Sequence, residues 1–305
     1  MQIVFISDLH LLTENPVARL DNLPDTQLNK LTYLLDYASD NNNSVIIAGD
    51  VFDRPRSWYL LPDIIDILNK YKNVPIYCVY GQHDTYFYHE DTKQATSLGV
   101  LWKSGLITLL DKTPEIVDNV HIYGASITQQ VPDVIDETKT NILVIHAPIA
   151  EEALFPSHDY LDAKKFLDKN SKYDIILCGD IHRKFLIPSD DKCRVILNTG
   201  PVLRKEGNEY NMTHVPGFYV IDKETNKIKF EELPHENAED VLTRDHIIGK
   251  KGREESFGKF VDALNTKEVK KGINIKKSVQ QFAEENKVSS DVKDILAKKM
   301  SKEKK

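Results

Sequence analysis

Short apolar segments rich in isoleucine and valine recur along the first two thirds of the chain, and amphipathic helical patterns separate several of them. Several segments are continuous apolar runs of four or five residues, which is typical of strands buried on both faces of a sheet. The segments span 3–6, 45–48, 76–80, 142–145, 175–178 and 195–197. Strands that alternate with helices predict a layered α/β fold.

The pattern changes near residue 246. Two apolar segments before it, 218–221 and 228–233, predict a β-hairpin that closes the α/β region. After it, three apolar stripes at helical spacing follow without strand-like segments, at 257–264, 275–282 and 292–296. We therefore expect a domain over 1–245 and a linker with a helical segment over 246–305.

Composition is that of an ordinary soluble globular protein. The chain has 305 residues, of which 41% are hydrophobic and 29% charged. No apolar run approaches the ~20 residues of a membrane span, and the first residues lead into a strand-like segment rather than a signal peptide. Three widely spaced cysteines without a C-x-x-C pair favour a reducing compartment, so we expect a cytoplasmic protein that contacts no membrane.

The net charge of −7 is unevenly divided. Residues 246–305 carry 16 Lys and Arg against 9 Asp and Glu, whereas residues 1–245 carry 24 against 38. An acidic body argues against a protein that coats nucleic acid by overall charge. It remains compatible with local phosphate chemistry, because clustered carboxylates hold divalent metals.

Metal-binding residue types follow five of the predicted strands. Ligand sites in α/β sheets form at the carboxyl edge of the strands, so these side chains can converge on one crevice. Two metals ~3.5–4 Å apart need a shared carboxylate and mixed oxygen and imidazole ligands. A single Asp-x-His pair arises often by chance, but five such strand ends predict a two-metal site rather than polar loop caps. They are Asp8-Leu9-His10, Gly49-Asp50-Val51-Phe52-Asp53, Gly81-Gln82-His83-Asp84, His146 and Gly179-Asp180-Ile181-His182.

These ordered segments resemble the motifs of calcineurin-like metallophosphoesterases. Within that superfamily, the segments 49–54, 198–204 and 216–221 resemble SbcD-type DNA repair nucleases, including compact ones encoded by bacteriophages. The resemblance implies an α/β fold of two facing β-sheets flanked by helices, a four-layer sandwich, plus a C-terminal helical segment. The nuclease domain would then occupy residues 1–245.

The resemblance also implies a role for each polar residue. The first metal would be held by Asp8, His10, Asp50 and His182. The second would be held by Asp50, Gln82, His146 and Asp180, so that one carboxylate bridges the two ions. Outside both coordination shells, His83 would protonate or stabilise the leaving oxygen, and Asp84 would orient its ring.

Two of these ligands depart from the family's usual pattern. The family usually has asparagine where Gln82 stands, and histidine where Asp180 stands. The glutamine carbonyl starts one methylene further away, and the aspartate adds negative charge and a harder oxygen. Two manganese ions are therefore the expected cofactor, with magnesium as the alternative.

Residues beside the expected metals are candidates for contact with DNA. Arg54 and Arg56 could meet a phosphate, although surface charges need no function. Tyr86 and the aromatic residues after it could stack on unpaired bases. Packing of this segment against the sheet is the alternative, and it is slightly favoured.

The resemblance implies a metal-dependent DNA exonuclease or endonuclease that works with an SbcC-type coiled-coil ATPase in repair or recombination. The C-terminal helical patterns are too short to be stable alone, so we expect them to bind that ATPase rather than their own core. Two alternatives stay open: a stand-alone phosphoesterase acting on phosphoprotein or nucleotide, and a non-catalytic subunit. The oligomeric state is open as well, with a homodimer among the options.

Overall fold

The computed structural model describes residues 2–222, 225, 227–245 and 247, together with Gln280, Ala283, Glu284, Val288 and Lys293. Contacts divide the chain into two units, Met1–His246 and Ile247–Lys305. The predicted linker and the three C-terminal apolar stripes lie outside the described residues. The fold is therefore that of the first unit.

One six-stranded sheet contains the N-terminal strand. Its strands, in order across the sheet, are β14 (Lys227–Glu232), β13 (Gly217–Asp222), β1 (Gln2–Ile6), β2 (Ser44–Ile47), β3 (Ile76–Cys78) and β4 (Thr108–Leu109). The strands from β1 to β4 run parallel to one another, and β13 and β14 add an antiparallel hairpin beside β1. The predicted closing hairpin is thus present.

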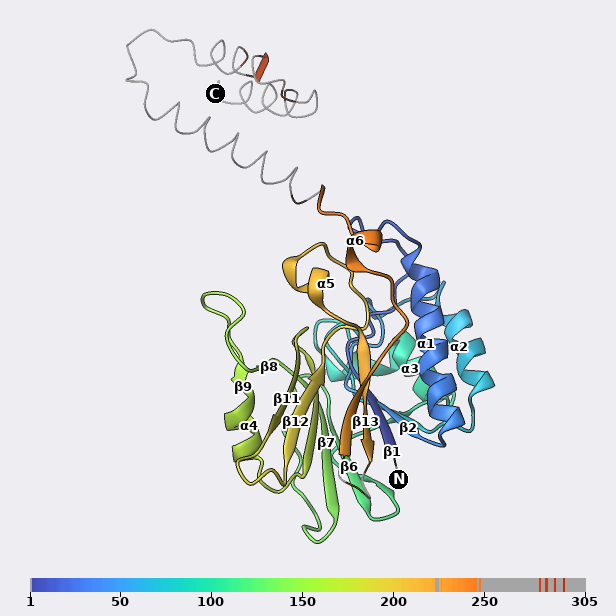
Figure 1. The fold of residues 1–305 in the computed structure, drawn as a ribbon. Helices are drawn as coiled ribbons and strands as arrows, with labels where there is room; N and C mark the ends of the chain where they lie inside the picture. The colour runs from blue at the N-terminus through green and yellow to red at the C-terminus, as the bar shows by residue number, and fades with distance from the viewer. Residues whose placement is uncertain are drawn as a thin grey trace, which may run out of the picture. The chain divides into compact units, whose positions relative to one another are not determined.

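A second six-stranded sheet faces the first (Figure 1). Its strands, in order, are β11 (Lys184–Pro188), β12 (Val195–Thr199), β10 (Ile175–Asp180), β7 (Thr140–Ala147), β6 (Val120–Ala125) and β5 (Glu115–Val117). The four inner strands are parallel, and the two edge strands are antiparallel to their neighbours. A separate short parallel pair is formed by β8 (Ile149–Ala150) and β9 (Leu161–Asp162).

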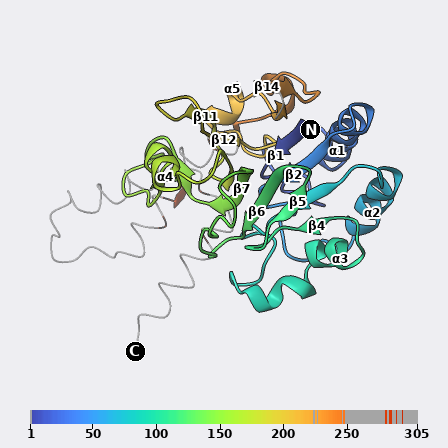
Figure 2. The ribbon, with the colours of Figure 1, turned by 90° about the horizontal axis from the view of Figure 1, so that it is seen from below.

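Helices cover the outer face of each sheet, as Figure 2 shows from below. The first sheet is covered by α1 (Leu23–Asp40), α2 (Leu61–Lys70) and α3 (Ser97–Lys103), and the second by α4 (Ala163–Lys169). Alternation along β1 explains the layering, because Val4 and Ile6 join the helix-side core while Ile3 and Phe5 join the core between the sheets. The predicted four-layer arrangement is confirmed.

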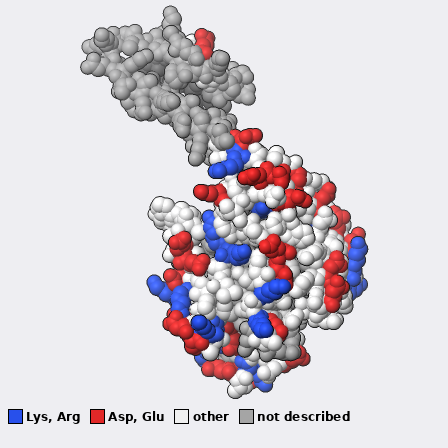
Figure 3. Space-filling model, viewed as in Figure 1, with Lys and Arg blue, Asp and Glu red and all other residues white. Residues whose placement is uncertain are grey.

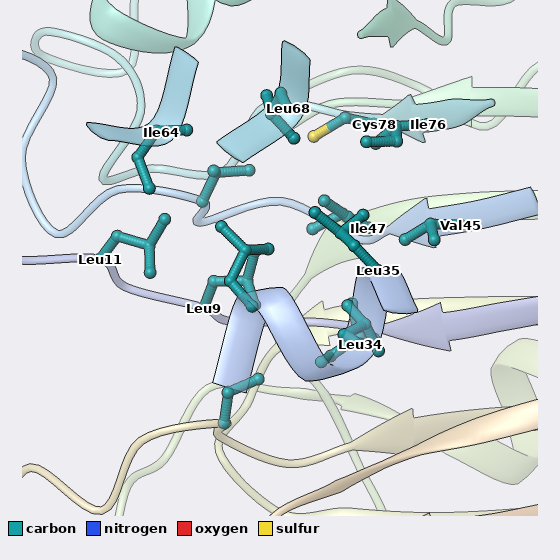
Figure 4. Packing of buried hydrophobic residues seen from close by; sticks show 14 of the residues in the cluster. Leu9, Leu11, Leu34, Leu35, Val45, Ile47, Ile64, Leu68, Ile76 and Cys78 are labelled. Carbon is teal, nitrogen blue, oxygen red and sulfur yellow. The ribbon is translucent and has the colours of Figure 1, made fainter. Parts of the chain in front are cut away.

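The helix-side core fixes α1 and α2 against the first sheet (Figure 4). Leu34 on α1 and Leu68 on α2 pack among the β2 and β3 side chains Val45, Ile47 and Ile76, and none of the five is more than 6% exposed. Each such buried side chain stabilises the fold by about 1.5–3 kcal/mol. This packing sets where the loops after β1, β2 and β3 begin.

All the predicted strands are present, with ends displaced by at most two residues. The sequence reading missed β6, which is buried along its whole length, because His121 and Gly124 interrupt its apolar pattern. The remaining helical turns are a 3₁₀ helix, η1 (Glu90–Ala95), and the short helices α5 (Glu209–Thr213) and α6 (Ala238–Val241). Within the described part of the chain, no helix is both long and apolar enough to cross a membrane.

Candidate metal centre

The carboxyl ends of strands from both sheets meet at one edge of the sandwich, and the structure brings the predicted ligands together there. Asp8, His10, Asp50 and His146 are at most 1% exposed. The other three are partly buried: Gln82, Asp180 and His182. Parallel strands end on the same side of a sheet, which is why residues distant in sequence converge.

The backbone at this edge is strained. Asp8, His10, Asp50 and Asp180 all have positive φ, between 44° and 99°. A non-glycine residue in such a conformation costs about 1–3 kcal/mol and persists only where the surroundings hold it. Here a hydrogen bond of 2.8 Å from the His10 N–H to the Asp50 carbonyl helps to hold the first two loops together.

Two glycines allow the backbones to approach the polar cluster closely. A Cβ atom on Gly81 would overlap the carboxylate of Asp50, and one on Gly179 would overlap the carbonyl oxygen of Ala48. Only glycine leaves room for these contacts. The two glycines therefore allow close packing of the backbone around Asp50, His146 and Asp8.

One half of the cluster consists of Asp8, His10 and His182. The Nε2 atoms of the two imidazoles are 2.9 Å apart, and Asp8 Oδ1 lies 3.8 Å from Nε2 of His182. Asp8 Oδ2 and His10 Nδ1 are buried without a hydrogen-bond partner among the described residues. Burial, followed by the charge of Lys205, holds the pKa of His10 well below its usual value. A neutral imidazole with a free lone pair is the form that binds a metal.

The other half of the cluster is built around His146. Its Nδ1 lies 2.6 Å from the carbonyl oxygen of Ala48, and its Nε2 lies 2.5 Å from the amide oxygen of Gln82. The amide nitrogen of Gln82 in turn donates to Asp180 Oδ1 at 2.5 Å. If Nδ1 carries the proton, the Nε2 lone pair and the amide oxygen face each other, an arrangement that a cation would stabilise.

Asp50 lies between the two halves. Its Oδ2 atom is 3.5 Å from Nε2 of His10 and 3.6 Å from Nε2 of His146, and it has no hydrogen-bond partner among the described residues. Its Oδ1 accepts a hydrogen bond of 2.8 Å from the His83 N–H. Burial raises the pKa of Asp50 well above its usual value, and Asp84 and Asp8 add to the effect.

Such a site fits divalent cations. Its side chains form three overlapping groups whose possible ligand atoms lie within 4.8 Å of one another: Asp8, His10 and His182; His10, Asp50 and His83; and Asp8, Asp50 and His146. Carboxylates and imidazoles suit ions such as manganese, magnesium and zinc. Cations would also relieve the repulsion among the buried carboxylates. The assignment of each ligand to one metal stays a prediction.

The position of Asp84 differs from the prediction that it orients the His83 ring. Its carboxylate instead accepts backbone hydrogen bonds from Val51 and Phe52, at 3.2 and 3.0 Å, and from Gly81 at 3.1 Å. The tight turn after Gly81 directs this side chain inward, where burial raises its pKa to about 6. Asp84 thus joins the loops that follow β2 and β3.

The ring of His83 is held by another group. Its Nδ1 lies 2.9 Å from the backbone carbonyl oxygen of Asp53, and its ring packs edge-on against His10 at 4.7 Å between centroids. When Nδ1–H donates to this carbonyl, Nε2 is the atom left to exchange a proton. The role of His83 as an acid stays a prediction.

The sequence reading missed two charged residues beside the cluster. The Lys205 ammonium forms an ion pair with Asp53, whose Oδ1 lies 3.6 Å from Nδ1 of His10. Asp53 is the last residue of the motif at 49–53, but the resemblance assigns it no role. Lys205 directly follows the segment 198–204. That adjacency was the one available signal for the lysine.

Of the three candidate DNA-contact residues, Arg54 and Arg56 are exposed and Tyr86 is partly buried. Arg54 forms an exposed ion pair with Glu14 at 3.5 Å, and the Arg56 guanidinium lies 5.2 Å from the ring centroid of Tyr86. Phe87 and Tyr88 are 85% and 59% exposed. The packing alternative is therefore wrong for these two residues, because positive φ angles of 52° and 59° carry the chain outward before η1 begins.

Two curated proteins are similar to about half of this chain. Mre11 of Methanosarcina acetivorans, a DNA double-strand break repair protein, is 28% identical over 170 residues, which cover 50% of this chain and 26% of that protein. Mre11 of Methanosarcina mazei is 27% identical over 169 residues, which cover 50% and 25%. The matches thus span about a quarter of the length of these curated relatives.

An archaeal phosphodiesterase of known structure is similar over 76% of this chain and 100% of its own, with 16% identity and a TM-score of 0.42. The family model described as calcineurin-like phosphoesterase matches residues 1–184, well over half of the sequence. That range contains every residue predicted to bind a metal. The chain therefore belongs to the calcineurin-like phosphoesterase family.

Proposed function

We propose that this phosphoesterase is a metal-dependent phosphodiesterase that cleaves DNA, as an exonuclease or endonuclease. One observation carries the proposal: Asp50 Oδ2 lies 3.5 Å from Nε2 of His10 and 3.6 Å from Nε2 of His146, a position from which one carboxylate could bridge two metals. Two-metal sites of this kind support in-line displacement at phosphorus. The similarity to two archaeal DNA repair proteins supports DNA as the substrate.

The chain's own residues would bind and orient the phosphodiester. The metals, held by the seven predicted ligands, would activate water and neutralise phosphate charge. His83 would give a proton to the leaving oxygen from Nε2, while the Asp53 carbonyl keeps the ring oriented through Nδ1. Lys205 is a further candidate to contact a phosphate oxygen, because its side chain is 20% exposed and its ammonium pairs with Asp53 beside the cluster.

DNA would be held by local contacts near the metals. On the face shown in Figure 3, Lys and Arg side chains are interspersed with Asp and Glu. The described residues form no continuous basic track on that face, so the proposal of DNA binding does not rest on one. Exposed Phe87 and Tyr88 offer faces on which unpaired bases can stack, and Arg56 sits over the ring of Tyr86. Single-stranded ends are the substrates that such residues suit.

One comparison tests the activity. Purified full-length protein with manganese is given end-labelled DNA, a generic phosphodiester and a phosphomonoester, each with and without a chelator. We expect cleavage of the DNA and of the small diester, and loss of both with the chelator. Cleavage of the monoester alone would exclude the nuclease and favour the stand-alone phosphoesterase. Absence of any cleavage with intact metal binding would favour the non-catalytic subunit.

We further propose that residues 246–305 bind an SbcC-type ATPase. Their basic balance suits an acidic partner, and their apolar stripes need a surface to pack on. Every predicted ligand precedes residue 183, and β14 ends at Glu232, so a chain cut after residue 248 should fold and cleave the small diester. A pull-down, thermal melting and the diester assay are compared for both chains. Unfolding of the shortened chain would instead show that these residues stabilise the catalytic domain.

A further inference from the structure

A cavity lies between α1 and the segments 203–204 and 234–241, and none of the predicted metal ligands is among the residues that line it. Its volume is about 440 Å³, within the range of pockets that hold small ligands. Residues that line it include Arg19, Lys30, Tyr33 and Arg204. None of these residues was singled out by a motif, apart from the inclusion of Arg204 in the segment 198–204.

Three basic side chains of this cavity are buried. Arg19 is 8% exposed, Lys30 6% and Arg204 5%. Among the described residues, Arg19 alone of the three forms an ion pair, with Asp21 at 2.6 Å. Two further acidic residues line the cavity, Asp36 and Glu236, but both are exposed. The lining as a whole contains three acidic and three basic residues, but its buried charged side chains are all basic.

Lys30 is one of these buried basic side chains. Its ammonium has three N–H donors, but the structure gives it one hydrogen bond, a long one of 3.4 Å to the carbonyl oxygen of Val202. Burial, followed by the charges of Arg204 and Arg19, lowers the pKa of Lys30 to about 7. Buried charges in proteins are normally paired. An anion in the cavity would supply the missing partner.

We propose that this cavity binds a small phosphate-bearing anion, held by Lys30 and Arg204, with Arg19 adding its positive charge at the wall. Lysine and arginine both favour phosphate oxygens, and arginine can donate two parallel hydrogen bonds to them. Tyr33 and Thr26 add polar groups at the wall. The volume admits either inorganic phosphate or a phosphomonoester as large as a nucleotide.

The cavity is distinct from the metal centre but is connected to it by one segment. The Val202 N–H lies 3.5 Å from the carbonyl oxygen of Asp8, while the Val202 carbonyl accepts the bond from Lys30. The two basic residues that follow Val202 in this segment contact different sites. Arg204 lines the cavity, and Lys205 pairs with Asp53 beside the candidate metal centre. Residues 202–205 thus contact both sites.

Phosphate binding by the full-length chain tests the proposal. Labelled inorganic phosphate is dialysed to equilibrium against the protein with a chelator present, so that binding through metals is excluded. We expect about one phosphate per chain for the wild type, and binding at least about tenfold weaker for Lys30→Met, because a charge-assisted hydrogen bond is lost. Lys72→Met, which removes an exposed lysine, is the matched control and should bind like the wild type.

Two further measurements complete the test. Lys30→Met should melt at no lower temperature than the wild type in phosphate-free buffer, which shows that lost binding is not lost folding. Competition by deoxyadenosine monophosphate would identify a phosphomonoester as the ligand, and failure to compete would identify inorganic phosphate; either outcome supports the site. No metal-independent binding, or equal binding by Lys30→Met, would overturn it. Neither result depends on nuclease activity, so the two proposals fail separately.

Discussion

The Nε2 atoms of His10 and His182 face each other at 2.9 Å, although 172 residues separate the two histidines along the chain. His10 comes from the loop after β1 in the first sheet, and His182 from the turn after β10 in the second. Carboxylates of Asp50 and Asp8 lie within 3.8 Å of these nitrogens. Two imidazoles and two carboxylates in one largely buried cluster suit a metal ion better than they suit an apolar core.

Replacement of the shared carboxylate gives the first prediction. Asp50→Asn should remove metal from both halves of the site and abolish phosphodiester cleavage, because the bridging anion is lost while the shape is kept. Metal content per folded chain is measured by mass spectrometry. Asp63→Asn, an exposed aspartate on α2, is the control and should keep its metal. Two ions per chain in Asp50→Asn would reject the bridging assignment.

His83→Ala should separate chemistry from metal binding. Loss of a positioned acid lowers turnover by ~10²–10⁴, while the metal content stays that of the wild type. Turnover of the small diester and metal content are measured on the same preparation. His89→Ala removes an exposed histidine of the same loop and should have little effect. Because His83 also groups with His10 and Asp50, loss of a metal from His83→Ala would show that it is a ligand.

Asp180 offers a test of metal preference. Its carboxylate accepts a hydrogen bond from Gln82, whose amide oxygen faces His146, so Asp180 belongs to the His146 half of the cluster. Asp180→His should shift the preferred ion from manganese or magnesium towards zinc, because imidazole is a softer ligand than carboxylate. Activity is titrated against each ion for both proteins. Identical profiles would mean that Asp180 does not touch a metal.

Replacement of the exposed aromatic residues Phe87 and Tyr88 should weaken DNA binding without changing turnover of the small diester. Serine in place of both Phe87 and Tyr88 is expected to weaken single-stranded DNA binding by about 30-fold or more, since each of the two stacked bases contributes about 1–3 kcal/mol. Turnover of the small diester should be unchanged. Ile116→Ser is the matched control, because Ile116 is 60% exposed on β5 and pairs with His121 at the start of β6, away from the strand ends that carry the ligands. Equal losses on DNA and the small diester would point to misfolding instead.

Lys30 predicts an unusual dependence of stability on pH. Its folded pKa of about 7 lies below the ordinary value of 10.5, so the folded chain binds fewer protons than the unfolded chain between those values. The destabilising effect of its charge is therefore complete below pH 7 and is lost as the pH rises towards 10.5. Relative to Lys30→Met, the wild type should gain about 3–5 kcal/mol of unfolding free energy across this range.

Denaturant unfolding in phosphate-free buffer at pH 7 and pH 10 measures this difference. Neighbouring charges belong in the comparison, because Arg204 and Arg19 lower the pKa of Lys30 while Asp21 raises it. Lys72→Met serves as the reference for an exposed lysine. Parallel pH dependence of wild type and Lys30→Met would show that burial and the neighbouring charges do not lower the pKa of Lys30.

The sequence by itself predicted most of the strands and the edge of the sheets at which the candidate metal ligands gather. Runs such as 175–178 are local patterns, and burial on both faces of a parallel strand leaves few alternatives to an apolar run. Polar residues directly after these runs lie at one sheet edge, because parallel strands end on the same side. The sequence alone therefore predicts that Asp8, Asp50 and His146 lie close together. These predictions needed only the order of residues along each strand and loop.

The tertiary structure decided which side chains from different loops contact one another. Asp84 binds backbone N–H groups of a neighbouring loop instead of the His83 ring, and Lys205 reaches Asp53 across 152 residues of sequence. Lys30 is a buried cation because α1 lies against the segment around Val202. Each of these contacts depends on which loops and elements pack side by side. That packing is set by residues far apart in the sequence, so a local sequence pattern does not predict it.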